Sequence, residues 1–189
     1  MSARLVGLGA VTGYGWGVPR LLDGIASQKS AAIDAEVDGQ RVWAGVIPEP
    51  DNGPLPPDDR YEAAIAAAVD EAVEDATARG WRPGPTVGLI FSTGIADIRT
   101  VRDNYFSGGP RPRPSLFPHT LHTAPGSIEA TRRGWTGPNL VLNAACSSGN
   151  VALQTAELWL RSGLATDVVV AGAEMCLIDG IVTGFRRMR

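Results

Sequence analysis

Short apolar runs alternate along the chain with longer segments whose apolar residues recur at helical spacing. Such runs, bounded by glycine or polar residues, are typical of strands buried on both faces of a mostly parallel sheet, with helices between them. An extended piece at Arg41–Ile47 is interpreted as an excursion from that sheet. The pattern predicts an α/β fold whose core strands lie at Arg4–Leu8, Val87–Ser92, Asn139–Asn143 and Asp167–Ala171.

The clearest helical periodicity runs over Asp58–Arg79. The two aspartates at its start are suited to cap this helix, and Gly80 is suited to end it. A second helical pattern begins at Ser148 and ends at Gly163. It is apolar on most sides, as expected of a helix covered by other elements on both sides; in this chain alone, one side is expected to face water. Two stretches rich in proline or glycine are predicted to be irregular: Pro48–Pro57 and Ser107–Pro118.

The composition of the 189 residues is that of a globular protein, because 44% of them are hydrophobic. A net charge of −3 gives no electrostatic basis for binding nucleic acid or an anionic membrane. No apolar run approaches the ~20 residues of a membrane span, and the N-terminus lacks the long apolar region of a signal peptide. Two cysteines are too few for a disulfide scaffold. We therefore expect a cytoplasmic protein with one domain, or one domain and a small extension.

The glycines near the N-terminus resemble a dinucleotide-binding loop only in part. After Gly7 and Gly9, the position that requires the third glycine holds Thr12, and Gly13 comes one residue late. No acidic residue follows at the end of a second strand of the same unit. The preferred interpretation is that these glycines let the chain turn sharply off the first strand.

Cys146 is the candidate nucleophile. It follows a predicted buried strand and precedes a predicted helix, in the sequence NAACSSGNVA. A strand, tight turn and helix in this order place the sulfur near a helix N-terminus, where free N–H groups and the helix dipole favour thiolate over thiol. The serine nucleophile of an α/β-hydrolase is presented by the same kind of turn. The opposing interpretation is a buried, inert cysteine, which is the commoner fate of a free thiol.

Two other potential sites are weaker on sequence grounds. Cys176 lacks the strand-to-helix setting and is interpreted as a packing residue. His119 and His122 have the spacing of two metal ligands, but no third ligand is apparent, so a metal site is not expected.

Several segments together resemble the N-terminal half of a β-ketoacyl synthase, a condensing enzyme of the thiolase fold used in fatty-acid and polyketide synthesis. RLVGLGAVTGYGWGVPRLLDGIASQKSAA resembles the opening strand, turn and first helix, and DRYEAAIAAAVDEAVEDA with TVGLIFSTG resembles the next helix and core strand. FPHTLHTAPGSIEATRRGWTGPN resembles the approach to the site. NAACSSGNVALQTAELWLRSGLATDVVVAGAEM resembles the nucleophile segment and the following strand.

The resemblance implies specific roles for a few residues. Cys146 matches the acyl-accepting cysteine, which relatives of the chain-length-factor type lose, often to glutamine. Glu174 matches a glutamate at a strand end, for which we expect a structural, hydrogen-bonding role. Asn143 and Ala144 depart from the serine and threonine that many relatives carry. His119 and His122 do not match the catalytic histidines.

The resemblance also implies what this sequence does not contain. Two histidines, a lysine and a glycine-rich loop from the C-terminal half contribute to decarboxylation and condensation in the family. We expect residues 1–189 to form a ketosynthase N-terminal-like domain that lacks its last strand and the whole C-terminal half. Asp167–Ala171 would then have an unpaired edge, a known aggregation liability, and a stable isolated monomer is not expected.

The resemblance implies an acyl carrier protein as partner and no resident cofactor, because the substrates are carried on the carrier's phosphopantetheine. It also implies a homodimer, or a heterodimer with another ketosynthase chain or a C-terminal half. Asn139–Asn143 matches the strand that pairs across the dimer interface. Candidate basic residues for a carrier surface are Arg132, Arg133, Arg186, Arg187 and Arg189.

Three functions remain open on sequence alone. In the first, the chain is part of a β-ketoacyl synthase, with Cys146 accepting the acyl group and histidines supplied by a missing or separate half. In the second, it is a non-catalytic, half-length partner that binds a complete ketosynthase and modulates it. The third, a thiol acyl carrier or hydrolase with an unrelated base, is least favoured because no suitably placed base can be named.

Overall fold

The computed structural model describes residues 3–51, 53–56, 60–106 and 121–188. These residues divide into two compact units, one made of residues 3–6 and 77–175 and the other of residues 7–76 and 176–188. Most of the predicted irregular stretch Ser107–Pro118, and the two aspartates at positions 58 and 59, lie outside the described residues. Each unit is therefore considered by itself.

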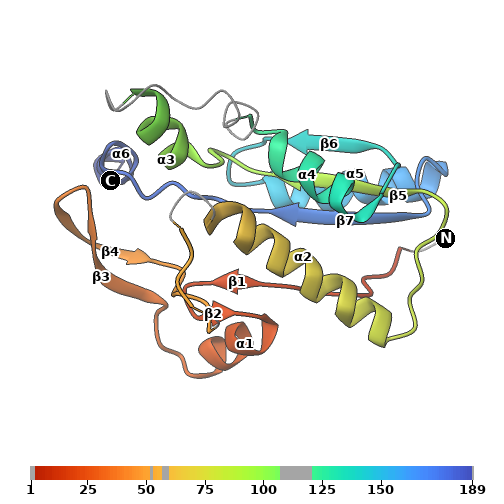
Figure 1. The fold of residues 1–189 in the computed structure, drawn as a ribbon, viewed down its shortest axis with the longest axis horizontal. Coiled ribbons are helices and arrows are strands. Elements are labelled where there is room, and N and C mark those ends of the chain that lie inside the picture. The colour runs from red at the N-terminus through yellow and green to blue at the C-terminus, as the bar shows by residue number, and fades with distance from the viewer. Residues whose placement is uncertain (1–2, 52, 57–59, 107–120, 189) are drawn as a thin grey trace. The chain divides into compact units, whose positions relative to one another are not determined.

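The first unit is organised around a parallel sheet (Figure 1). Its three strands are β5 (Val87–Ser92), β6 (Asn139–Leu142) and β7 (Asp167–Gly172). The order is β6-β5-β7, with Leu89 paired to Asn139 and Val87 paired to Asp167. Three of the predicted core strands are thereby confirmed. Within the described part of the chain β6 and β7 each pair with one neighbour only, so both are edges of the sheet.

Helices pack on both faces of this sheet, as the sequence predicts. They are α4 (Ala124–Arg133) and α5 (Ser148–Ser162). All six residues of β5 are buried, and their side chains alternate between the two faces. A Cβ at Gly126 of α4 would lie 3.1 Å from atoms of both Leu89 and Phe91. Ile90, between them, packs instead against Ala152 and other residues of α5. This arrangement holds the segment between β6 and α5 at the carboxyl end of the sheet.

The remaining elements of the first unit are short. They are α3 (Ile98–Val101) and a π-helical turn, η1 (Arg102–Phe106). Asp97 caps α3, because its Oδ1 accepts a hydrogen bond from the Thr100 amide at 3.0 Å. The predicted end of α5 at Gly163 is confirmed, since this glycine has the left-handed conformation, φ 73°, that ends many helices.

The second unit combines two hairpins with three helices. Its elements are β1 (Val11–Thr12), β2 (Gly15–Trp16), α1 (Val18–Ala26), β3 (Ala32–Val37), β4 (Gln40–Gly45), α2 (Arg60–Ala78) and α6 (Asp179–Arg187). Strands β3 and β4 pair antiparallel in a two-stranded sheet of their own. The extended piece predicted at Arg41–Ile47 is therefore an excursion, as expected, although its partner β3 was not predicted. Helix α2 stops before Gly80, which adopts φ 90°.

The predicted core strand at Arg4–Leu8 is wrong. Residues 3–10 form no strand in the structure, and the first strand is the two-residue β1. Gly7 and Gly9 lie directly on α2, because a Cβ built on them would fall 2.0 Å and 1.8 Å from main-chain oxygens of that helix. The amides of Leu8 and Ala10 donate to the carboxylates of Asp75 and Glu71 of α2, at 3.1 and 2.9 Å. Helix side chains thus satisfy donors that a neighbouring strand would otherwise bind.

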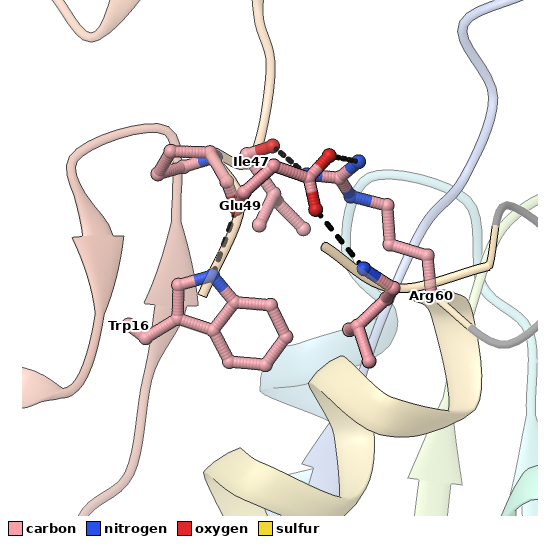
Figure 2. A network of polar contacts seen from close by, with 6 residues as sticks. Trp16, Ile47, Glu49 and Arg60 are labelled. Carbon is pink, nitrogen blue, oxygen red and sulfur yellow. Dashed lines mark hydrogen bonds and ion pairs between the residues drawn. The ribbon is translucent and has the colours of Figure 1, made fainter. Parts of the chain in front are cut away.

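A polar network in the second unit holds the proline-rich loop after β4 (Figure 2). The Arg60 guanidinium donates to the Ile47 carbonyl and to Glu49 Oε1, both at 2.7 Å. Trp16 Nε1 donates to the Pro48 carbonyl at 2.8 Å. The hydrogen bond from Arg60, and then the one from the Leu55 amide, hold the pKa of Glu49 below its usual range. The predicted loop has no helix or strand over its described residues, and side-chain bonds fix its start.

No helix in the described part of the chain is both long enough and apolar enough to cross a membrane.

Candidate active site

Cys146 lies between strand β6 and helix α5, where the sequence pattern places it. Strand β6 forms because Asn139–Leu142 is a short apolar run that pairs in parallel with the fully buried β5. Small residues follow the strand, and the helix begins two residues after the cysteine at Ser148. The predicted order of strand, turn and helix around Cys146 is therefore confirmed.

The turn around Cys146 is held by hydrogen bonds among residues 144–148. The Ser148 hydroxyl accepts from the Ala144 amide at 2.9 Å and donates to the Ala145 carbonyl at 2.7 Å. The Ser147 hydroxyl donates to the Ala144 carbonyl at 2.7 Å. Ala145 adopts φ 50°, a left-handed conformation that non-glycine residues rarely take up. Such a conformation persists only where its surroundings fix it, as these bonds do.

The side chain of Cys146 is exposed to solvent. Ser147 is the residue at the start of α5, and its side chain makes no capping hydrogen bond to the helix. The amide donors in the first turn of a helix have no partner within the helix. In α5 this turn directly follows Cys146 and Ser147, and the Ser148 amide donates to the Ala145 carbonyl at 3.1 Å. Cys146 is therefore not buried, as the opposing interpretation supposed, while its role as a nucleophile stays a prediction. An electrophile from solvent can reach this sulfur.

Glu174 has the hydrogen-bonding role expected for it. Its carboxylate follows β7 and binds the loop that follows β5. It accepts hydrogen bonds from the Ile95 amide at 3.0 Å and the Ala96 amide at 3.1 Å, and also from the Gly94 amide. The Thr93 hydroxyl adds a fourth bond at 3.1 Å. The loop of residues 93–96 is thus fixed next to the carboxyl ends of β5 and β7.

Asn143 is a site residue that the sequence marked only as a departure from the family pattern. Its Nδ2 donates to the Gly94 carbonyl at 2.7 Å, and its Oδ1 accepts from the Ala145 amide at 3.1 Å. It therefore connects the loop held by Glu174 to the turn before Cys146. A polar side chain directly after an apolar strand is the one sequence signal that points to such a role.

Neither His119 nor His122 is seen beside Cys146 in the described structure. His122 is exposed in the turn before α4, and His119 lies outside the described residues. Within the described ranges, no group of three or more histidine, cysteine or acidic side chains could hold a metal ion. Cys176 belongs to the other unit and is half-buried.

The candidate carrier-binding arginines of the first unit are engaged in local bonds. Arg132 and Arg133 pair with the buried carboxylate of Glu129, at 3.0 and 3.2 Å. Arg133 also lies over the Trp135 ring, 5.2 Å from its centroid. In the second unit, Arg186 donates to the Arg41 carbonyl at 3.3 Å. Arg189 lies outside the described residues.

Two of the hollows on the described surface do not include Cys146 among their lining residues. One, of about 220 Å³, lies in the first unit beside Arg133 and Trp135. The other, of about 460 Å³, is an apolar groove in the second unit between β4 and α6, and Cys176 is among its lining residues.

A family model described as the N-terminal domain of β-ketoacyl synthase matches residues 57–189, which is well over half of the chain. The chain belongs to this family. The matched part of this ketosynthase domain includes β5, β6, α5, β7 and the turn that carries Cys146.

Two curated proteins similar to this chain are named as a polyketide synthase system protein and a putative 3-oxoacyl synthase. This chain is 31% identical over 131 residues to the spectinabilin polyketide synthase system protein NorA of Streptomyces orinoci, and the match covers 68% of this chain and 6% of that protein. It is 26% identical to a putative mitochondrial 3-oxoacyl-[acyl-carrier-protein] synthase of Schizosaccharomyces pombe, covering 98% of this chain and 49% of that protein. The chain thus spans half or less of these relatives.

Solved structures show that the fold is thiolase-like, as the sequence predicts. The ishigamide ketosynthase/chain length factor superposes with a TM-score of 0.75 at 20% identity, over 97% of this chain and 55% of that one. A type II polyketide synthase ketosynthase, solved in complex with its acyl carrier protein and bound to the hexaketide, gives a TM-score of 0.77 at 21% identity. That match covers 97% of this chain and 48% of the other.

Proposed function

We propose that this ketosynthase domain supplies the acyl-accepting cysteine of a β-ketoacyl-[acyl carrier protein] synthase, and that Cys146 is that cysteine. The observation that carries the proposal is the exposed Cys146 side chain at a turn fixed by hydrogen bonds, between a core strand and the start of α5. Family membership supports the same role. Histidines of a separate or further segment supply the decarboxylation step that completes the condensation.

In the proposed acyl transfer, every bond and proton is accounted for by the Cys146 thiol, the thioester and solvent, without any resident cofactor. After the Cys146 thiol loses its proton to solvent, Sγ attacks the carbonyl carbon of an acyl thioester carried on phosphopantetheine. A new S–C bond forms, and the carrier's S–C bond breaks. The carrier sulfur leaves as a thiolate and takes a proton from solvent. Negative charge develops on the carbonyl oxygen, so nearby N–H donors at the helix end accelerate the step.

Acylation by a simple thioester tests this role. The 189-residue chain is incubated with an acyl thioester of N-acetylcysteamine, and the modified residue is located by mass spectrometry of its peptides. The expected result is one acyl group on Cys146, which disappears in Cys146→Ala and persists in Cys176→Ala. Acylation that is absent, or that falls equally on both cysteines, would contradict the proposal. Repeating the reaction with a candidate histidine-bearing chain shows whether a partner accelerates it.

A non-catalytic partner of a complete ketosynthase is the second candidate. The favouring observation is that β6 is an edge strand in the described structure and that leucines on β6 and α5 are exposed, namely Leu140, Leu153 and Leu158. Exposed apolar side chains next to an unpaired strand suit association with another chain. This candidate predicts binding to a complete ketosynthase with no acyl group on Cys146. The acylation experiment therefore separates the two functions.

A further inference from the structure

Glu174 turns the loop after β5 into a fixed platform. A single carboxylate accepts hydrogen bonds from three consecutive main-chain amides of residues 94–96, which leaves that loop little freedom to move. Thr93, 2% exposed, adds to the arrangement: its single hydroxyl proton is shared between the Glu174 carboxylate and the Ala173 carbonyl, each at 3.1 Å, and its oxygen accepts from the Ala96 amide at 2.8 Å. A Cβ at Gly94 would lie only 3.3 Å from a Glu174 oxygen. The loop and the carboxylate are therefore closely packed.

Asn143 connects this platform to the turn that presents Cys146. Its amide has one orientation, because Nδ2 faces the Gly94 carbonyl at 2.7 Å and Oδ1 faces the Ala145 amide at 3.1 Å. The second bond acts on the residue with φ 50°, directly before the cysteine. One side chain thus joins a rigid loop to a strained main-chain position. Displacement of Ala145 would move the sulfur relative to the start of α5.

We infer that Asn143 is a positioning residue for Cys146: it holds the turn at Ala145 against the loop fixed by Glu174, so that the sulfur keeps one place at the end of α5. This inference rests on the proposed function only in taking Cys146 as the acyl acceptor. Asn143 does not act on the substrate. Its two hydrogen bonds confine the nucleophile, and a nucleophile confined near its attack geometry reacts faster than a mobile one.

The test compares Asn143→Leu with Gln154→Leu in the 189-residue chain. Leucine has nearly the shape of asparagine but makes neither hydrogen bond, and Gln154 is an exposed residue of α5 beyond its first turn that serves as the control. Acyl transfer from the thioester probe to Cys146 is expected to be roughly five- to tenfold slower in Asn143→Leu, since two hydrogen bonds of ordinary strength are lost. The control is expected to react at the wild-type rate.

Alkylation by iodoacetamide separates positioning from general loosening. The rates at Cys146 and Cys176 are measured across a pH series, together with the midpoint of thermal unfolding. If Asn143 positions Cys146, Asn143→Leu changes how the alkylation rate of Cys146 depends on pH. The alkylation rate of Cys176 and the midpoint of thermal unfolding then stay the same as in the control. The inference would be overturned if Cys146 reacted as in the control, or if both cysteines became faster together.

A second variant, and the behaviour of the wild type, separate failure of the positioning role from failure of the proposed function. If Asn143→Leu fails to fold, Glu174→Gln loosens the same loop without touching the turn and is expected to slow Cys146 in the same direction but less. A wild-type chain that accepts no acyl group would refute the proposed function, and the alkylation series would still decide the role of Asn143. Acylation of the wild type with an unchanged rate in both variants would refute the positioning role alone.

Discussion

At the scale of single residues, Glu49 makes a charge-dependent contribution to the second unit. Its carboxylate accepts hydrogen bonds from the Arg60 guanidinium at 2.7 Å and from the Leu55 amide at 3.2 Å. These bonds favour the charged form and lower the pKa of Glu49. A carboxylate whose pKa is lower in the folded chain than in the unfolded chain stabilises the fold above the unfolded value. That contribution is lost as the pH falls through the folded value.

The pH dependence of unfolding checks this contribution. The wild type is expected to have a higher unfolding midpoint than Glu49→Gln at neutral pH. The difference should shrink as the pH falls below about 4.3, the ordinary glutamate value, and vanish at more acid pH. High salt should reduce it, because this ion pair is exposed. Asp23→Asn, which removes an exposed carboxylate from α1, is the control. A difference that stayed constant or grew with acidity would contradict the assignment.

The parts of the site that could be predicted from sequence are those whose residues lie next to one another in the chain. The position of Cys146 follows from an apolar run, small residues and a helical pattern that adjoin one another. The hydrogen-bonding role of Glu174 came from the family resemblance. The role of Asn143 was not predictable, because its partner Gly94 is 49 residues away and only the pairing of β5 with β6 brings the two together.

At the scale of elements, β5 is the centre of the first unit. It pairs with a strand on each side and has a helix on each face, and Ile90 is completely buried. Helix α5 is different, because it is covered mainly on the side facing the sheet. Leu158, on the other side, is 65% exposed. In the described chain one side of α5 therefore faces solvent, as the sequence analysis expects for this chain alone.

Truncation of these two side chains should have unequal effects. Ile90→Ala is expected to lower the free energy of unfolding by about 2–5 kcal/mol, since it removes buried methyl groups and leaves a cavity. Leu158→Ala should change it by less than about 0.5 kcal/mol, because an exposed side chain loses little on truncation. Urea unfolding followed by circular dichroism measures both. Equal effects would show that α5 is covered in solution by another surface.

Strands were predicted well where apolar runs are continuous and poorly where they are not. β5, β6 and β7 form the parallel sheet and are continuous apolar runs in the sequence, although only β5 is fully buried and the predicted burial of β6 is not found in the described chain. β3 carries two acidic residues among its six, so its pattern did not stand out. The run Arg4–Leu8 looks like a strand, but its glycines and amides are matched to α2 instead. The local sequence pattern cannot show whether an extended segment pairs with a strand or lies against a helix.

At the scale of the whole molecule, the fold class was predictable because several segments match one family in the right order. What the sequence indicated less directly is how much apolar surface this chain leaves uncovered. Both units expose large apolar side chains, among them Leu153 and Leu158 in the first and Trp43 and Phe185 in the second. Exposed apolar surface of this kind favours association.

The purified chain is expected to self-associate as its concentration rises. Sedimentation velocity over a wide concentration range should show species larger than a monomer, and Leu158→Lys should shift the distribution toward the monomer. Gln154→Lys adds the same charge at an exposed position of α5 without removing an apolar side chain, so it should leave the distribution almost unchanged. A single monomeric species at every concentration would contradict the expectation.

The central position of β5 has a consequence for the order of events during synthesis. Its partners are β6, whose Asn139 pairs with Leu89, and β7, whose Asp167 pairs with Val87. A ribosome adding ~5–20 residues per second needs roughly 2–9 s to travel from the end of β5 to the start of β6. Throughout that interval the most apolar strand of the nascent chain lacks a neighbour. A chaperone that recognises extended apolar segments would find its clearest target there.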